Sequence, residues 1–369
     1  MKVVVVTGAS GSVGSRLIRS LVERVDVERV VALDQVKPAL DHPKLSVAEV
    51  DLSVLTQAQE SAVVALAAGA TAIIHLAWAA GDDDASSVEE QRALARSNVN
   101  AVKAALGLAS RCGVAAFVHV SSATVYGAWS DNDVPLSEQS RILPNPELPF
   151  AVAKAEAERV IAEWSDANRA VSVAVLRPAV TVGSADRRLY GALDATGVPG
   201  FAPEGRLVQY LHVDDLATAV EFAWEQRLDG VFNVAPDAGI AEEEARRLAG
   251  GLAYFDVPGR LGALLAALGW KVWRKGVPPE ALAYATYPWV VSPDRLVGAG
   301  WRPAYSSAEA FVATDPRWHW DDLPPGKRQN LNSLLLLLVS SGLSATALGL
   351  LAWWRRRRRT VTAEAGLPR

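Results

Sequence analysis

Cysteine is almost absent from this sequence of 369 residues, in which Cys112 is the only one. A single thiol excludes an internal disulfide framework and a cysteine-based metal site. Histidine is also sparse, and no two histidines stand at the HxxxH spacing of a metal-binding helix. The five are His42, His75, His119, His212 and His319. We therefore predict no structural metal.

An excess of positive charge is missing as well, since the formal net charge is −4. Basic residues are not concentrated before the C-terminal segment, so the composition gives no reason to expect nucleic-acid binding. We also expect no secretory signal. Lys2 alone precedes a short apolar run that leads at once into glycines, which is typical of a buried strand.

Charged residues are absent between Leu331 and Trp354. This run of about 24 residues is long enough to cross a bilayer as a helix. Trp353 and Trp354 stand where an interfacial aromatic anchor lies, and five arginines follow. We predict a linker at 321–330, a membrane-anchoring helix at 331–354 and a basic tail at 355–369. A single span places the arginines on the far side of the membrane, whereas a hairpin bent at residues 340–342 keeps both ends on one side.

In the first half of the chain, short apolar segments alternate with segments of helical length. The expected strands are Val3–Thr7, Arg29–Asp34, Ala72–Leu76, Ala115–Ser121 and Val171–Arg177, and the expected helices are Val54–Ala68, Glu89–Arg111 and Ala151–Asn168. This alternation predicts an α/β fold, a doubly wound parallel sheet of the Rossmann type over residues 1–177. A smaller substrate lobe follows at 178–320, interleaved with the first domain. Functional residues are expected in the loops at the carboxyl ends of the strands.

The first expected strand runs into glycines at Gly8, Gly11 and Gly14, and a helical pattern follows from Ser15. Glycine lets the backbone approach a dinucleotide pyrophosphate closely, and a helix N-terminus offers unpaired N–H groups to the phosphates. The remaining loop residues assigned to the cofactor are Ser10, Ser12 and Val13. A glycine-rich turn without a ligand is the alternative.

Asp34 ends the second expected strand, about 20 residues further on, where a carboxylate binds a ribose 2′-hydroxyl. A carboxylate there repels a 2′-phosphate. We therefore expect NAD rather than NADP, and we place the folded part of the chain on the cytoplasmic side of a membrane.

Further motifs follow in order along roughly the first 315 residues. They are TGASGSVG at Thr7–Gly14, Asp34, Asp51-Leu52, HLAW at His75–Trp78, SSATVYG at Ser121–Gly127, Lys154, LRP at Leu176–Pro178, HVDD at His212–Asp215 and GWRP at Gly300–Pro303. In this order they resemble the extended short-chain dehydrogenases/reductases, of the NAD-dependent epimerase/dehydratase kind typified by UDP-sugar 4-epimerases.

The resemblance implies roles at the cofactor for residues outside the glycine loop. Asp51 and Leu52 flank the adenine, Pro178 lies near the nicotinamide, and Lys154 holds the ribose. Leu76, Ala77 and Trp78 line the dinucleotide. Packing at strand ends is the alternative for these residues, and His212–Asp215 are expected to hold the second lobe together.

The reaction of this family uses a serine or threonine, a tyrosine and a lysine. Ser122 matches the hydroxyl that binds the reacting oxygen, Thr124 assists it, and Lys154 matches the lysine. Four residues before Lys154, where the tyrosine should stand, this chain has Phe150, which cannot ionise or donate a hydrogen bond. Losing a positioned acid/base costs a factor of about 10²–10⁴ in rate.

Two hypotheses follow from this substitution. The chain is either a membrane-anchored oxidoreductase with an atypical site, or a non-catalytic NAD-binding sensor or assembly subunit. As an enzyme it would act on a nucleotide sugar, or as a reductase or dehydrogenase on a lipid-linked or sterol-like alcohol. We further predict a homodimer through residues 98–111 and 151–168, membrane lipid contact through 331–354, and a second contact at 261–275.

Overall fold

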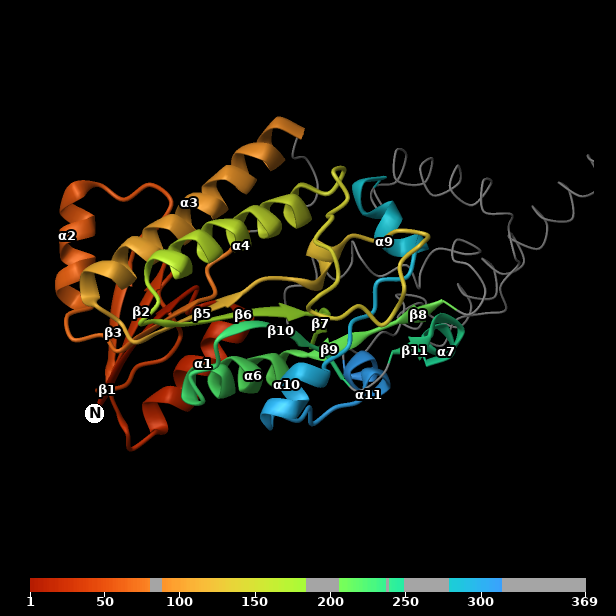
Figure 1. Ribbon diagram of the computed structural model, residues 1–369. Coiled ribbons are helices and arrows are strands. Elements are labelled where there is room, and N and C mark those ends of the chain that lie inside the picture. The colour runs from red at the N-terminus through yellow and green to blue at the C-terminus, as the bar shows by residue number, and fades with distance from the viewer. Residues whose placement is uncertain (80–87, 184–205, 237–238, 249–278, 314–369) are drawn as a thin grey trace, which may run out of the picture. The chain divides into compact units, whose positions relative to one another are not determined.

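In the computed structural model, seven parallel strands form one sheet in the order β10-β6-β5-β4-β1-β2-β3 (Figure 1). They are β1 (Lys2–Thr7), β2 (Val27–Asp34), β3 (Leu45–Glu49), β4 (Ala72–His75), β5 (Ala116–Val120), β6 (Ser172–Pro178) and β10 (Gly230–Val234). The parallel α/β sheet is confirmed. Five strands match the expected segments to within two residues, whereas β3 was missed and β10 comes from the region assigned to the second lobe.

The structure describes residues 1–79, 88–183, 206–236, 239–248 and 279–313, all within the compact unit Met1–Pro316. The predicted linker at 321–330, membrane helix at 331–354 and basic tail at 355–369 lie outside these residues. The predicted membrane contact at 261–275 lies outside them too. Among the residues described, no helix is long and apolar enough to span a bilayer.

Helices cover both faces of the sheet (Figure 1). On one face α1 (Ser12–Glu23) packs against α6 (Val213–Glu225), and on the other α2 (Gln57–Leu66), α3 (Val88–Cys112) and α4 (Pro149–Ala167) lie over the strands. Local signals set where these helices begin. A capping box between Thr56 and Gln59 starts α2, and a proline at the first position starts α4.

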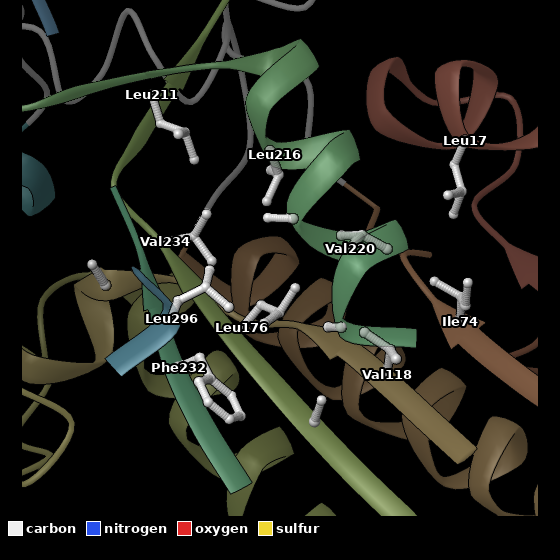
Figure 2. Close-up of a cluster of buried hydrophobic side chains, with 14 of the residues drawn as sticks. Leu17, Ile74, Val118, Leu176, Leu211, Leu216, Val220, Phe232, Val234 and Leu296 are labelled. Carbon is white, nitrogen blue, oxygen red and sulfur yellow. The ribbon is translucent and has the colours of Figure 1, made fainter. Parts of the chain in front are cut away.

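The sheet is buried on both faces, which explains why its strands are almost continuously apolar. Val4 and Ile74 face α1 and α6, and their neighbours Val5 and Ile73 face α3 and α4. Figure 2 shows part of the first cluster, where Leu17 of α1 and Val220 of α6 lie over strand side chains such as Ile74, Val118 and Leu176.

Helices α3 and α4 lie side by side (Figure 1). Ala105 and Ala109 of α3 and Ala157 of α4 are buried in one cluster, so small residues allow the two helices to approach closely within the chain. The predicted homodimer through these helices stays a prediction.

The second lobe consists of short elements. β7 (Val180–Val182) pairs with β9 (Tyr210–His212), and β8 (Leu207–Val208) pairs with β11 (Ile240–Ala241). The described helices of this lobe are α7 (Glu242–Leu248), α9 (Leu282–Thr286), α10 (Asp294–Ala299) and α11 (Ser307–Val312), with a 3₁₀ turn at Pro279–Ala281. Another 3₁₀ turn, Ala123–Tyr126, lies outside the lobe, in the loop after β5.

The HVDD segment links the lobe to the C-terminal end of the described chain. Asp215 accepts hydrogen bonds from the N–H groups of Ala304, at 2.8 Å, and Tyr305, at 3.1 Å. The ring of Tyr305 also packs on His212. These contacts agree with the structural role expected for residues 212–215.

Candidate functional site

The glycine loop between β1 and α1 packs tightly against neighbouring backbone atoms. Gly8 has a φ of +68°, in the left-handed region that favours glycine. A Cβ at Gly8 would lie 2.6 Å from the backbone nitrogen of Ala77, and one at Gly14 would lie 2.1 Å from the Gly8 oxygen. The fold itself therefore requires these two glycines. A Cβ at Gly11 would meet only the Gly8 oxygen, at 3.3 Å, so Gly11 leaves space beside the loop.

Helix α1 begins at this space, with Gly11 as its N-cap residue. Within the described part of the chain, no side chain caps α1, and its first turn contains no acidic residue. The N–H groups of Ser12, Val13 and Gly14 lie in the turn whose donors have no intrahelical partner, and the helix dipole adds partial positive charge there. This end of α1 suits an anionic group such as a phosphate.

Asp34, at the end of β2, lies beside the glycine loop. Its Oδ2 accepts a hydrogen bond of 2.8 Å from the Ser10 N–H, and its Oδ1 accepts one of 2.7 Å from the Gln35 N–H. One ligand can therefore contact both the loop and the carboxylate. The space at Gly11, the uncapped helix and Asp34 together fit NAD.

The other residues predicted at the cofactor also follow strand ends. Asp51 Oδ1 accepts hydrogen bonds from the Ser53 N–H at 2.8 Å and hydroxyl at 2.7 Å, and Leu52 beside it is buried. Pro178 is buried at the end of β6. Leu76, Ala77 and Trp78 follow β4 and are half-buried. Their roles in cofactor binding stay predictions.

We expect Gly11→Ala to weaken NAD binding by about tenfold or more, because the added methyl group occupies the space beside the loop. The backbone at Gly11 is extended, with φ −67° and ψ 172°, a conformation open to alanine, and the added Cβ requires only a small shift of the Gly8 oxygen, 3.3 Å away. Stability should therefore change by less than about 1 kcal/mol. Isothermal titration calorimetry and urea unfolding measure the two effects.

Gly107→Ala is the matched control, because nothing lies within 4 Å of a Cβ added to this α3 glycine. It should stabilise the protein by about 0.5–1 kcal/mol and leave NAD affinity unchanged. Unaltered NAD affinity in Gly11→Ala would contradict the loop as the phosphate site.

The loop after β5, residues 121–127, carries the predicted catalytic residues and is called the catalytic loop below; here the structure brings Ser122 and Thr124 together. The Thr124 hydroxyl donates a hydrogen bond of 3.0 Å to Ser122 Oγ, and the Thr124 N–H donates one of 3.2 Å to the same oxygen. Both side chains are buried. Since Ser122 Oγ accepts both of these bonds, its own proton remains free for a further acceptor.

Lys154 of α4 contacts the end of β5, directly before this loop. Its Nζ donates a hydrogen bond of 2.8 Å to the Val120 carbonyl and lies 3.6 Å from the centre of the Trp78 ring. Phe150, one turn earlier, meets Trp78 edge-on at 5.7 Å. Burial lowers the pKa of Lys154 to about 7, against the opposing influence of Glu158. The sequence did not predict that Trp78 covers the lysine.

Two tyrosines lie near the loop, but neither replaces the missing phenol. The Tyr126 hydroxyl donates to Asn233 Oδ1 at 2.7 Å and accepts from Arg177 at 2.8 Å. The Tyr284 hydroxyl donates to the Thr124 carbonyl at 2.7 Å. Burial raises the pKa of both hydroxyls. Both are therefore structural hydrogen-bond donors at neutral pH.

Sequence reasoning missed a buried ion pair next to the loop. Arg177 binds Glu158 with two nitrogens, Nε at 3.0 Å from Oε1 and Nη2 at 2.5 Å from Oε2. Glu158 also accepts a hydrogen bond from Ser121, which precedes Ser122. The one available signal was spacing, since Glu158 lies four residues after Lys154 on the same helix.

A small cavity of about 20 Å³ lies in the second lobe, enough for one water molecule. Arg206, Gln209, Tyr284 and Trp289 are among its lining residues. Arg206 is buried, with its Nε bound to Glu242 at 2.8 Å and its Nη1 to the Tyr284 carbonyl at 2.9 Å. Through Tyr284 this cavity is connected to the catalytic loop.

The parallel sheet and the glycine loop define a dinucleotide-binding α/β protein. The model of the NAD dependent epimerase/dehydratase family matches residues 4–235, and the chain belongs to this family. A dTDP-glucose 4,6-dehydratase of Streptomyces griseus is 25% identical over 345 residues, which cover 87% of this chain and 96% of the relative.

Two solved structures share the fold. One is DesIV of Streptomyces venezuelae, a dTDP-glucose 4,6-dehydratase with NAD and TYD bound, which is 21% identical with a TM-score of 0.62 over 86% of this chain and 97% of that one. The other is MoeE5 in complex with UDP-glucose and NAD, which is 20% identical with a TM-score of 0.61 over 84% and 96%.

Proposed function

We propose that this protein is an NAD-dependent epimerase or dehydratase that acts on a nucleotide sugar. The observation that carries the proposal is that two sites lie at the carboxyl ends of the parallel strands. The glycine loop with Asp34 suits NAD, and Ser122 follows β5 two residues after Val120, whose carbonyl accepts a hydrogen bond from Lys154. Relatives named for dTDP-glucose and solved with UDP-glucose support the substrate class.

In this proposal, Ser122 donates its proton in a hydrogen bond to the reacting oxygen of the sugar, and Thr124 holds Ser122 in place. Trp78 and Phe150 exclude water from one side of Lys154. When bound, NAD would accept the hydride. A non-catalytic NAD-binding protein is the second candidate, favoured by Phe150 and by the engaged hydroxyls of Tyr126 and Tyr284.

The test asks whether NAD bound to the full chain is reduced by a nucleotide sugar. We expect the absorbance of reduced nicotinamide to appear on addition of UDP-glucose or dTDP-glucose. Phe150→Tyr restores a phenol four residues before Lys154 and should raise the rate by about tenfold or more, because a positioned acid/base contributes about 10²–10⁴.

Phe150→Leu is the control, since it changes the ring without adding a hydroxyl, and it should give no increase. If neither sugar reduces NAD in the native protein or in Phe150→Tyr, the non-catalytic candidate stands. A Phe150→Tyr variant that lowers a measurable rate would show that the site uses different chemistry.

A further inference from the structure

The phenol of Tyr284, on α9 in the second lobe, contacts the peptide that shapes the catalytic loop. The Thr124 carbonyl accepts a hydrogen bond of 3.0 Å from the Gly127 N–H, which closes the 3₁₀ turn, and one of 2.7 Å from the Tyr284 hydroxyl. Thr124 in turn donates its hydroxyl and its N–H to Ser122 Oγ. The residue that fixes the predicted catalytic serine is therefore itself held by a side chain of the second lobe.

The same hydroxyl oxygen reaches the other end of the loop through Asn145. It accepts a long hydrogen bond of 3.4 Å from the Asn145 N–H. The Asn145 side chain pairs with the backbone of Ala128, directly after the loop, by accepting from its N–H at 2.7 Å and donating to its carbonyl at 3.2 Å. One phenol is thus bonded to the 3₁₀ turn directly and linked to the residue after the loop through one side chain.

Tyr284 is fixed in place by other residues of the second lobe. Its carbonyl accepts hydrogen bonds of 2.9 Å from Arg206 Nη1 and of 2.9 Å from Trp289 Nε1, and its ring meets the Trp289 ring edge-on at 5.3 Å. Arg206 is bound in turn to Glu242 of α7 at 2.8 Å, and both of these side chains are buried. Since Tyr284 is fully buried, the phenol cannot leave the Thr124 carbonyl unless these contacts move with it.

The fold can lose this hydroxyl without leaving the loop unpaired. The Thr124 carbonyl keeps the Gly127 N–H, and Asn145 keeps the backbone of Ala128. The Asn145 N–H, which makes the longest of these bonds, loses its acceptor. The hydroxyl of Tyr284 therefore contributes less to the stability of the loop than to its connection with the second lobe.

We propose that Tyr284 is a positioning residue, through whose hydroxyl the second lobe sets the place of Ser122 at the reacting oxygen of the sugar. This inference rests on the proposed function. No proton moves to or from Tyr284, because the phenol acts by holding Thr124, which orients Ser122. The lobe expected to bind the substrate thereby also fixes the group that acts on it.

The connection is measurable without turnover, by hydrogen exchange of the Thr124 and Gly127 amides in the full chain. Tyr284→Phe keeps the ring and removes the hydroxyl, and these amides should then exchange about fivefold faster or more, the equivalent of one lost hydrogen bond. Trp301→Phe is the matched control, because it removes a donor of the same lobe, Nε1 bound to Thr218 at 3.2 Å, and should leave exchange in the loop unchanged. Native exchange in Tyr284→Phe overturns the proposal whatever the protein catalyses.

The catalytic half is tested by single-turnover reduction of NAD with UDP-glucose or dTDP-glucose as the probe. In Tyr284→Phe the rate at saturating sugar should fall by about tenfold or more, because a small displacement of a reacting group costs up to about 10²-fold. The half-saturating sugar concentration and the Kd for NAD should stay within about twofold of the native values, since ground-state binding is unchanged. Trp301→Phe should leave all three values unchanged. A native rate in Tyr284→Phe, or an equal fall in both variants, overturns the role of Tyr284.

A side chain that acts through Ser122 loses its influence once the serine hydroxyl is gone. In the Ser122→Ala background, adding Tyr284→Phe should therefore change the remaining rate by less than about twofold. A fall as large as the one in the native background would mean that Tyr284 acts elsewhere, and overturns the assignment. Absence of reduction in the native protein with either sugar overturns the proposed function and the catalytic half with it, while the exchange rates still decide whether Tyr284 holds the loop.

Discussion

Glu158→Gln is expected to lower the free energy of unfolding by about 3–5 kcal/mol, because it removes one partner of a buried ion pair and leaves Arg177 charged and uncompensated. The two side chains are 6% and 3% exposed, so water cannot replace the lost contact. The same substitution weakens the hydrogen bond from Ser121. Urea unfolding at pH 7, followed by circular dichroism, measures the change.

Glu156→Gln is the matched control, two residues earlier on the same helix. Its carboxylate pairs with Arg159, but the two side chains are 43% and 55% exposed. Exposed pairs contribute about 0–1 kcal/mol, so this variant should stay within that range. Equal effects of the two substitutions would contradict a special role for the buried pair.

Ser121→Ala separates the hydrogen bond from the ion pair. It leaves Glu158 and Arg177 together and should cost about 1 kcal/mol, so the variant stays folded. The contacts among Ser121, Glu158 and Arg177 lie directly before Ser122. We therefore expect them to fix the position of the catalytic loop as well as to stabilise the core. The glutamate on α4 thereby joins two neighbouring strands, β5 through the loop that follows it and β6 through Arg177.

Local patterns were enough to predict the parts of the fold that depend on neighbouring residues. Apolar runs located five strands, and glycine spacing located the loop where Gly8 and Gly14 touch backbone. The sequence pattern did not predict β3, because this half-buried edge strand lacks a continuous apolar run.

Contacts between distant residues could not be predicted in the same way. Tyr284 binds the Thr124 carbonyl across 160 residues, and Trp78 covers Lys154 from another strand end. No spacing in the sequence encodes such pairs, because they depend on how the strands are ordered. The surroundings of Lys154 and Phe150 follow from these contacts, so only the structure shows which groups lie beside them.

The second prediction with a large effect concerns the loss of folding stability at low pH. His75 and His119 are register partners on β4 and β5, with stacked rings 5.4 Å apart and almost no exposure. Thr7 Oγ1 lies 2.8 Å from His75 Nδ1, whereas His75 Nε2 and both ring nitrogens of His119 have no hydrogen-bond partner among the described residues. Neutral rings fit this site, and charged rings do not.

Burial, together with the charge of Lys154, lowers the pKa of His75 to about 3 and holds that of His119 well below its ordinary value. The unfolded chain therefore binds protons below pH 6.5 that the folded chain does not bind. Each histidine contributes stability that is complete above pH 6.5 and is lost as the pH falls toward the folded pKa. Between pH 7 and 5 this loss is about 2 kcal/mol for His75, and His119 adds a loss in the same direction.

His119→Phe should remove one of these two contributions. Phenylalanine stacks on His75 as the imidazole does and leaves no ring nitrogen unpaired, so stability at pH 7 should change by less than about 1 kcal/mol. The loss between pH 7 and 5 should become smaller than in the native protein, measured by urea unfolding at both pH values. His42→Gln, on a surface loop, should leave that loss as it is in the native protein. A His119→Phe variant with the native loss would mean that the imidazole of His119 takes up its proton without unfolding the site.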